Sequence, residues 1–185
     1  MVSRLTSTAS PKRALSSSIA RARSSAATAS SRFGEAVDVS RETTRYAPPR
    51  RRARGAVESY ADAAGRIDLA VRNVRVLARG TIRALSLDEN VPPEIAGALR
   101  DLAAAVRGLA GALEDPEHDG AVREPALRAA AQATLVLEAT GNLSVSVIVG
   151  QIRSTAADLL AATGMSYDQS AGAVRDAVRA AEDAL

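Results

Sequence analysis

The sequence predicts an all-α protein, an antiparallel four-helix bundle preceded by a disordered basic N-terminal tail. Hydrophobic residues make up 46% of the chain but aromatic residues only 2%, and an Ala-rich, aromatic-poor chain favours closely packed helices over a sheet sandwich. Apolar residues recur at spacings of three and four in several long segments, which is the period of an amphipathic helix. Short polar segments separate them, so consecutive helices are expected to be antiparallel neighbours.

The most apolar segment, residues 143–164, is predicted to be one helix with a face buried against other helices. Its first residues alternate as in a strand, but the pattern is too long for a typical strand. On a helix, an arc of roughly 120° contains Val145, Ile148, Val149, Ile152, Ala156, Leu159, Leu160 and Thr163. Outside this arc lie Ser146, Gly150, Arg153, Ser154 and Asp158, and Val147 is the large apolar residue out of place. Gly141 and Gly164 flank the helix, and Ser144 is the expected N-terminal cap.

Residues 55–85 are predicted to form the first helix. A heptad-like apolar stripe along it consists of Val57, Tyr60, Ala64, Ile67, Val71, Val74, Ala78, Thr81 and Leu85. An adjacent face carries Arg72, Arg75, Arg79 and Arg83, with Asp68 four residues before the first of them. Leu69 and Val76 lie on a further side, and a helix that is apolar on more than one side is central or has another partner. Leu69, Val76 and the four arginines are therefore the candidate partner surface.

Three further helices complete the predicted fold. The second, residues 94–113, follows Pro92-Pro93 and has the cleanest period, formed by Ile95, Leu99, Leu102, Val106, Leu109 and Leu113. The third, residues 121–139, is rich in Ala. A fifth helix, residues 168–185, either docks or frays. The bundle is expected to occupy residues 55–165, and the C-terminal helix lies within residues 166–185. An elongated array of helical hairpins and a dimeric bundle are the alternatives.

Positive charge is concentrated at the front of the chain. Residues 1–54 contain 12 Lys and Arg against 3 acidic residues, a net charge of +9, whereas residues 55–185 contain 12 against 18, a net charge of −6. Residues 1–34 have almost nothing to bury and no acid, so we expect residues 1–54 to be a disordered tail with a basic linker. A Ser- and Arg-rich start without acids is also typical of an organelle transit peptide, which is the alternative.

The sequence has no arrangement typical of a catalytic or metal site. Cysteine is absent, so there is no disulfide and no thiolate metal site. The single histidine, His118, lies in the acidic turn Glu114–Gly120, whose spacing matches neither a zinc-helix motif nor a calcium loop. The serines lack a partner histidine, and Gly108 and Gly111 are isolated within a predicted helix. We therefore predict a protein that is not an enzyme and uses no cofactor.

Two segments resemble a known family of membrane proteins. Residues 72–79 are R-N-V-R-V-L-A-R, and residues 147–164 are V-I-V-G-Q-I-R-S-T-A-A-D-L-L-A-A-T-G. Both resemble the soluble C-terminal region of bacterial aromatic acid exporters, which belong to the fusaric-acid-resistance-type (FUSC) family. The basic segment Tyr46–Arg54, the Pro92-Pro93 turn and Leu99–Leu113 occur in the same order as in that region. The resemblance covers residues 43–165.

The resemblance implies a helical cytoplasmic domain that follows a transmembrane bundle in exporters of small aromatic or organic compounds. Here Ser/Ala/Arg-rich residues take the place of that bundle, so no transport activity and no substrate-binding residue carries over. The best apolar candidate for a span, residues 143–160, contains Gln151, Arg153 and Asp158, and we expect no membrane crossing.

We expect a cytoplasmic domain, free or peripheral at the inner face of the cell membrane. Its expected partner is a membrane protein of the same family or a second copy of itself. A truncated or mis-started exporter is the other explanation for a chain of this kind.

The alternative function is non-specific nucleic-acid binding by the basic tail. The chain lacks aromatic stacking residues and a recognisable reading helix, so nucleic acid is a less favoured partner. Any binding should weaken steeply between ~50 and ~200 mM salt, because neutralised phosphates release counterions. Fluorescence anisotropy with a labelled duplex measures this dependence. Tight, sequence-selective binding at physiological salt would rank this alternative first.

Overall fold

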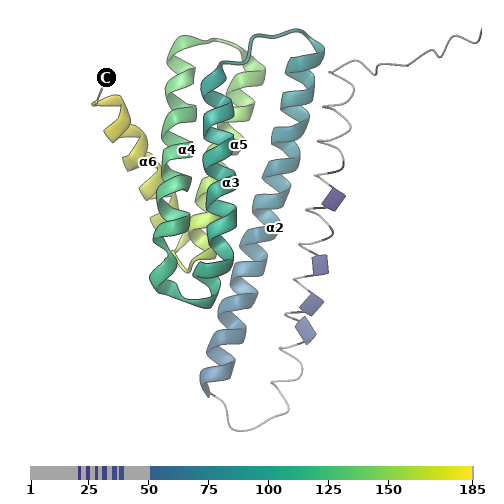
Figure 1. Ribbon diagram of the computed structural model, residues 1–185, viewed down its shortest axis with the longest axis vertical. Helices are drawn as coiled ribbons and strands as arrows, with labels where there is room; N and C mark the ends of the chain where they lie inside the picture. Colours follow the sequence, from purple (N-terminus) through teal and green to yellow (C-terminus); the bar gives the residue numbers. More distant parts are fainter. Residues whose placement is uncertain are drawn as a thin grey trace, which may run out of the picture.

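The computed structural model describes residues 51–184, together with ten upstream residues at positions 21, 24, 25, 28, 31, 32, 35, 36, 38 and 39. Residues 51–184 are all-α, as predicted, with five α-helices, one short 3₁₀ helix and no strand (Figure 1). The predicted disordered tail, residues 1–54, lies outside the described residues apart from Arg51–Arg54 and those ten positions. The ten positions have helical backbone and exposed side chains.

The helices follow one another with short connections. They are α2 (Arg51–Ser86), α3 (Pro93–Glu114), η1 (Pro116–His118, the 3₁₀ helix), α4 (Gly120–Ala139), α5 (Leu143–Ala162) and α6 (Tyr167–Glu182). Consecutive α-helices run in opposite directions (Figure 1). Helix α2 begins at Arg51 rather than Gly55, because arginine is a good helix former and continues the helix upstream. Part of the predicted basic linker is therefore the first turn of α2.

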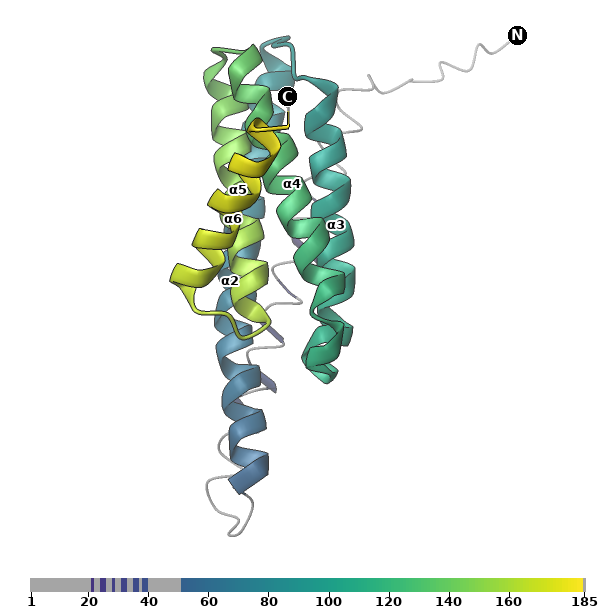
Figure 2. The same ribbon diagram turned by 90° about the vertical axis from the view of Figure 1, so that its left-hand side faces the viewer.

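Helix α5 is the centre of the bundle. It packs against α2, α4, α6 and α3, whereas α3 packs mainly against α4. The bundle is thus built from two pairs, α2 with α5 and α3 with α4, joined by the contact between α4 and α5. Helix α6 docks across α4 and α5 (Figure 2), with Ser170, Val174 and Val178 buried.

Two caps fix where the last two helices start. Asn142, not the predicted Ser144, caps α5, because its side-chain oxygen accepts a hydrogen bond from the Val145 backbone N–H at 3.1 Å while Ser144 is buried. Helix α6 begins with a capping box. The Ser166 hydroxyl accepts from the Gln169 backbone N–H at 3.2 Å, and the Gln169 side chain accepts from the Ser166 N–H at 2.9 Å.

The predicted core arc of α5 is confirmed, with one error. Seven of its eight residues are buried, Thr163 is half-buried, and Val147 is exposed as predicted. Asp158 was expected on the exposed side but is only 4% exposed. Helices pack against the C-terminal half of α5 on several sides, so a single arc does not describe its buried face. All eight residues of Thr155–Ala162 are buried, and Asp158 is one of them.

The predicted stripe of α3 is confirmed at Ile95, Leu102 and Leu109, but alanines take the remaining buried positions of α3 and most of those of α2. The buried residues of α2 are Ala63, Ala70, Leu77, Ala78 and Ala84, and Ala78 belongs to the predicted stripe. The core of α3 alternates large and small residues, at Ile95, Ala98, Leu102, Ala105, Leu109 and Ala112. Val74 and Val106, both predicted in these stripes, are exposed. Small side chains let the helix backbones approach closely, so the buried faces are rotated from those that bulk alone predicts.

We expect Gly108→Ala to destabilise the bundle. A Cβ at Gly108 would lie 2.5 Å from the backbone oxygen of Ala121 at the start of α4, so the α3–α4 contact would have to open, at about 1–3 kcal/mol. Gly150→Ala on α5 is the matched control, because no atom lies within 4 Å of its Cβ position. It should stabilise the helix by up to ~1 kcal/mol. Urea unfolding measures both changes, and equal effects would contradict the close α3–α4 approach.

Candidate functional site

Exposed apolar residues lie at both ends of the contact between α2 and α5. On α5, Leu143 is 78% and Val147 is 39% exposed; on α2, Leu69 is 37% exposed. Val147 lies against α2, since its Cγ1 would be 3.7 Å from a Cβ at Gly80. We call this region the α2–α5 face, defined by Leu69, Arg72, Val76, Arg79, Arg83, Leu143 and Val147.

The structure places all six residues of the predicted partner surface on the outer side of α2. Arg72, Arg79 and Arg83 are exposed, and Arg75 and Val76 are half-buried. The Arg72 guanidinium pairs with the Asp68 carboxylate at 3.5 Å, and both side chains are mostly exposed. Within the described part of the chain, no carboxylate forms an ion pair with Arg75, Arg79 or Arg83. This face therefore presents cationic groups that the bundle itself does not neutralise.

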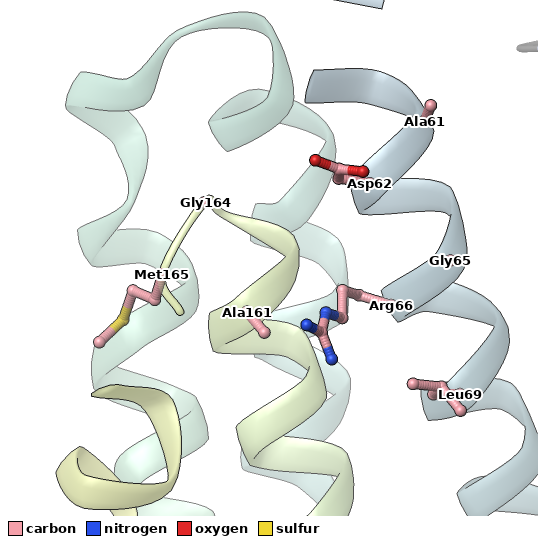
Figure 3. Close-up of a pocket in the computed structure, with 8 residues that line it drawn as sticks. All are labelled: Ala61, Asp62, Gly65, Arg66, Leu69, Ala161, Gly164 and Met165. Carbon is pink, nitrogen blue, oxygen red and sulfur yellow. The ribbon is translucent and has the colours of Figure 1, made fainter. Parts of the chain in front are cut away.

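A groove of about 620 Å³ lies at one end of this face, between α2 and the turn that joins α5 to α6 (Figure 3). Its lining residues are Ala61, Asp62, Gly65, Arg66, Leu69, Ala161, Gly164 and Met165. Gly164 makes the turn with a φ of +101°, a conformation that favours glycine. The Arg66 guanidinium lies 5.8 Å from the centre of the Tyr167 ring, a cation–π contact that ties α2 to the start of α6.

A polar pair, which the sequence analysis missed, holds α2 to α5 and consists of the buried Asp158 and the half-buried Asn73. The Asn73 side-chain amide donates a hydrogen bond of 2.7 Å to the Asp158 carboxylate. Burial raises the pKa of Asp158 above its usual 3.8, while the hydrogen bond from Asn73 and the charge of Arg66 act in the opposite direction. The helical pattern of residues 143–164 placed Asp158 on the exposed side, so no signal in the sequence pointed to this pair.

The remaining polar residues that the sequence singled out lie apart from this face or at its edge. The His118 ring lies 3.3 Å from the Asp115 carboxylate in the exposed turn between α3 and α4. Gln151 and Arg153 of α5 are both half-buried, and the buried Gln151 side-chain oxygen has no hydrogen-bond donor. Among the described residues, no three His, Cys, Asp or Glu side chains gather as they would around a metal ion.

No protein-family model, curated protein or solved structure matches the chain. Within residues 51–184, α5 is the one helix long and apolar enough to cross a membrane by length and composition, and 67% of its apolar window is buried in the bundle. Core helices of soluble proteins meet the same criterion, and this degree of burial accords with the central place of α5. The resemblance to the FUSC family stays a prediction.

The buried carboxyl of Asp158 should make stability depend on pH. The pKa of Asp158 is raised in the folded state, so folding at a pH between the unfolded-state and folded-state pKa values takes up a proton. The contribution of Asp158 to the free energy of unfolding is therefore largest below pH 3.8, the usual pKa of the group, and is lost as pH rises through the raised pKa. Urea unfolding of wild type and Asp158→Asn from pH 4 upward measures this. The free energy of unfolding of the wild type, relative to that of Asp158→Asn, should fall as pH rises.

The exposed Asp176→Asn variant on α6 controls for removal of a carboxylate as such. A difference between wild type and Asp158→Asn that is constant with pH would contradict the assigned burial effect.

Proposed function

We propose that the protein is a non-enzymatic helical domain that resembles the soluble part of a FUSC-type exporter of aromatic or organic acids. In this proposal it acts through helix–helix contacts with a membrane partner or with a second copy of itself. The observation that carries the proposal is the α2–α5 face, where exposed leucine and valine side chains lie along a row of arginines. Of these, Arg79 and Arg83 form no ion pair with a carboxylate of the described residues. Apolar patches rimmed by charge mark interaction sites in soluble proteins, and arginine is enriched at interfaces.

The chemistry of the described residues also supports binding rather than catalysis. Asp158 is the described carboxyl with a shifted pKa, but it is almost fully buried and its hydrogen-bond partner is an amide. A general acid or base must reach the proton that it transfers. We therefore assign Asp158 to the α2–α5 contact and place function on the outside of these helices. A cytoplasmic location, peripheral to the membrane when the partner is bound, follows from this proposal.

A photo-crosslinking residue in place of Val76 tests the proposal in cells that carry the full chain. We expect an ultraviolet-dependent adduct with a multi-spanning membrane protein, or else with a second copy of the chain. Arg75→Glu combined with Arg79→Glu should reduce the adduct without unfolding the bundle, because charge on an exposed face alters association more than stability.

Arg100→Glu with Arg107→Glu is the matched control, since it makes the same charge change at exposed positions of α3. It should leave the adduct unchanged. A chain that stays monomeric, remains in the soluble fraction and crosslinks to neither partner would contradict the proposed function.

A further inference from the structure

The outer side of α5 carries a stripe that is covered over only half of its length. Its residues, spaced by four and three, are Leu143, Val147, Gly150, Ser154, Ala157 and Ala161. Ala157 and Ala161 are buried, and α6 packs on this half of α5 (Figure 2). The other four residues are exposed. The stripe is therefore covered in its C-terminal half, where α6 packs on α5 and Ala161 lines the groove beside α2, and it is uncovered from Leu143 to Ser154.

The uncovered half of the stripe runs beside the arginine row of α2. The residues from Leu143 to Ser154 and those from Arg72 to Arg83 each span about 16 Å along a helix. The two helices are antiparallel and touch near Gly80 and Val147. A segment docked along the outer side of α5 would thus have arginines of α2 along one flank, over about three helical turns of α5. Open space above Gly150, with no atom within 4 Å of its Cβ position, allows a docked backbone to approach closely.

The distribution of charge along the chain indicates which kind of partner surface complements the α2–α5 face. Helix α2 contains eight arginines and three acidic residues, a net charge of +5. Residues 87–185 contain seven arginines and 15 acidic residues, a net charge of −8. The arginines of the α2–α5 face thus stand out from an otherwise acidic bundle. A second copy that presented the same face would bring a second arginine row into the interface, and like charges disfavour that arrangement.

We propose that the uncovered half of the α5 stripe and the α2 arginine row together bind one amphipathic helix of a partner protein. The bound helix is apolar toward α5 and carries Asp or Glu on the flank toward α2. This inference rests on the proposed function, whose partner it specifies by its chemistry. Apolar anchors at helical spacing give such a helix its affinity, and the carboxylates opposite Arg72, Arg79 and Arg83 give it orientation and selectivity.

A displayed library of helical peptides of about 18 residues tests the inference with the full chain as bait. Every peptide carries the same leucine stripe, and the two flanks are randomised among Glu, Lys, Gln and Ser. We expect the selected peptides to be enriched in Glu on one flank only. Arg79→Glu with Arg83→Glu should instead select Lys on that flank, and Gly150→Arg should weaken the selected peptides roughly ten-fold or more by blocking close approach.

Arg100→Glu with Arg107→Glu on α3 is again the control and should leave the selection unchanged. Circular dichroism confirms that each variant keeps its helices. Failure to select any peptide, or selection without acidic enrichment, would overturn the inference. The same holds if selected peptides bind Gly150→Arg as well as they bind wild type.

Two further measurements identify a different occupant. Binding to vesicles containing phosphatidylglycerol, lost in Arg79→Glu with Arg83→Glu, would assign the face to a lipid surface if no peptide is selected. A dimer in sedimentation equilibrium that Gly150→Arg converts to a monomer would assign it to a second copy. Selection of peptides without an adduct at position 76 to either a membrane protein or a second copy would contradict the proposed function and leave the helix site in place. An adduct without selection of peptides would support the proposed function and contradict the helix site.

Discussion

Burial of α5 is the constraint on which the rest of the structure depends. The chain has few aromatic residues, and neither of the described ones, Tyr60 and Tyr167, is fully buried. The largest fully enclosed side chains include Ile148, Ile152 and Leu160, all on α5. Their surroundings are mostly alanines of the neighbouring helices, and such a core reaches protein-like density only if the backbones approach closely. At Gly108 on α3 the backbone of α4 approaches so closely that no room is left for a side chain, whereas a Cβ at Gly80 on α2 would be in ordinary contact with Ile148.

Close packing has an electrostatic consequence at Asp158. The carboxyl is enclosed with the neighbouring core residues, and an enclosed charge is costly unless polar groups compensate for lost water. Asn73 supplies a hydrogen bond, and Arg66 supplies a nearby positive charge. Arg66 also lies over the Tyr167 ring, so these contacts connect α2, α5 and α6. They set the position of α2 along α5, and therefore the position of the arginine row beside the exposed stripe.

The bundle is asymmetric in both coverage and charge. Helix α6 follows one half of α5 and then lies mainly on α4, which leaves Leu143 and Val147 exposed. The neighbouring α2 is basic, whereas the rest of the bundle is acidic. Neither property stabilises the isolated fold, because exposed apolar area remains hydrated and the arginines have little to pair with. In the proposed complex, a partner on this face would bury the exposed apolar residues and pair with the arginines.

The sequence by itself determined the helices, the core arc of α5, the exposure of Val147 and the outward arginine row on α2. These features follow from the 3.6-residue period and the preference of arginine for water, which act within one helix. Only the tertiary structure decided that α2 pairs with α5, that alanines rather than Val74 or Val106 face the core, and that Asp158 is buried beside Asn73. Those outcomes depend on how closely two helices approach and on how many neighbours surround each side chain. The pattern along a single helix does not contain that information.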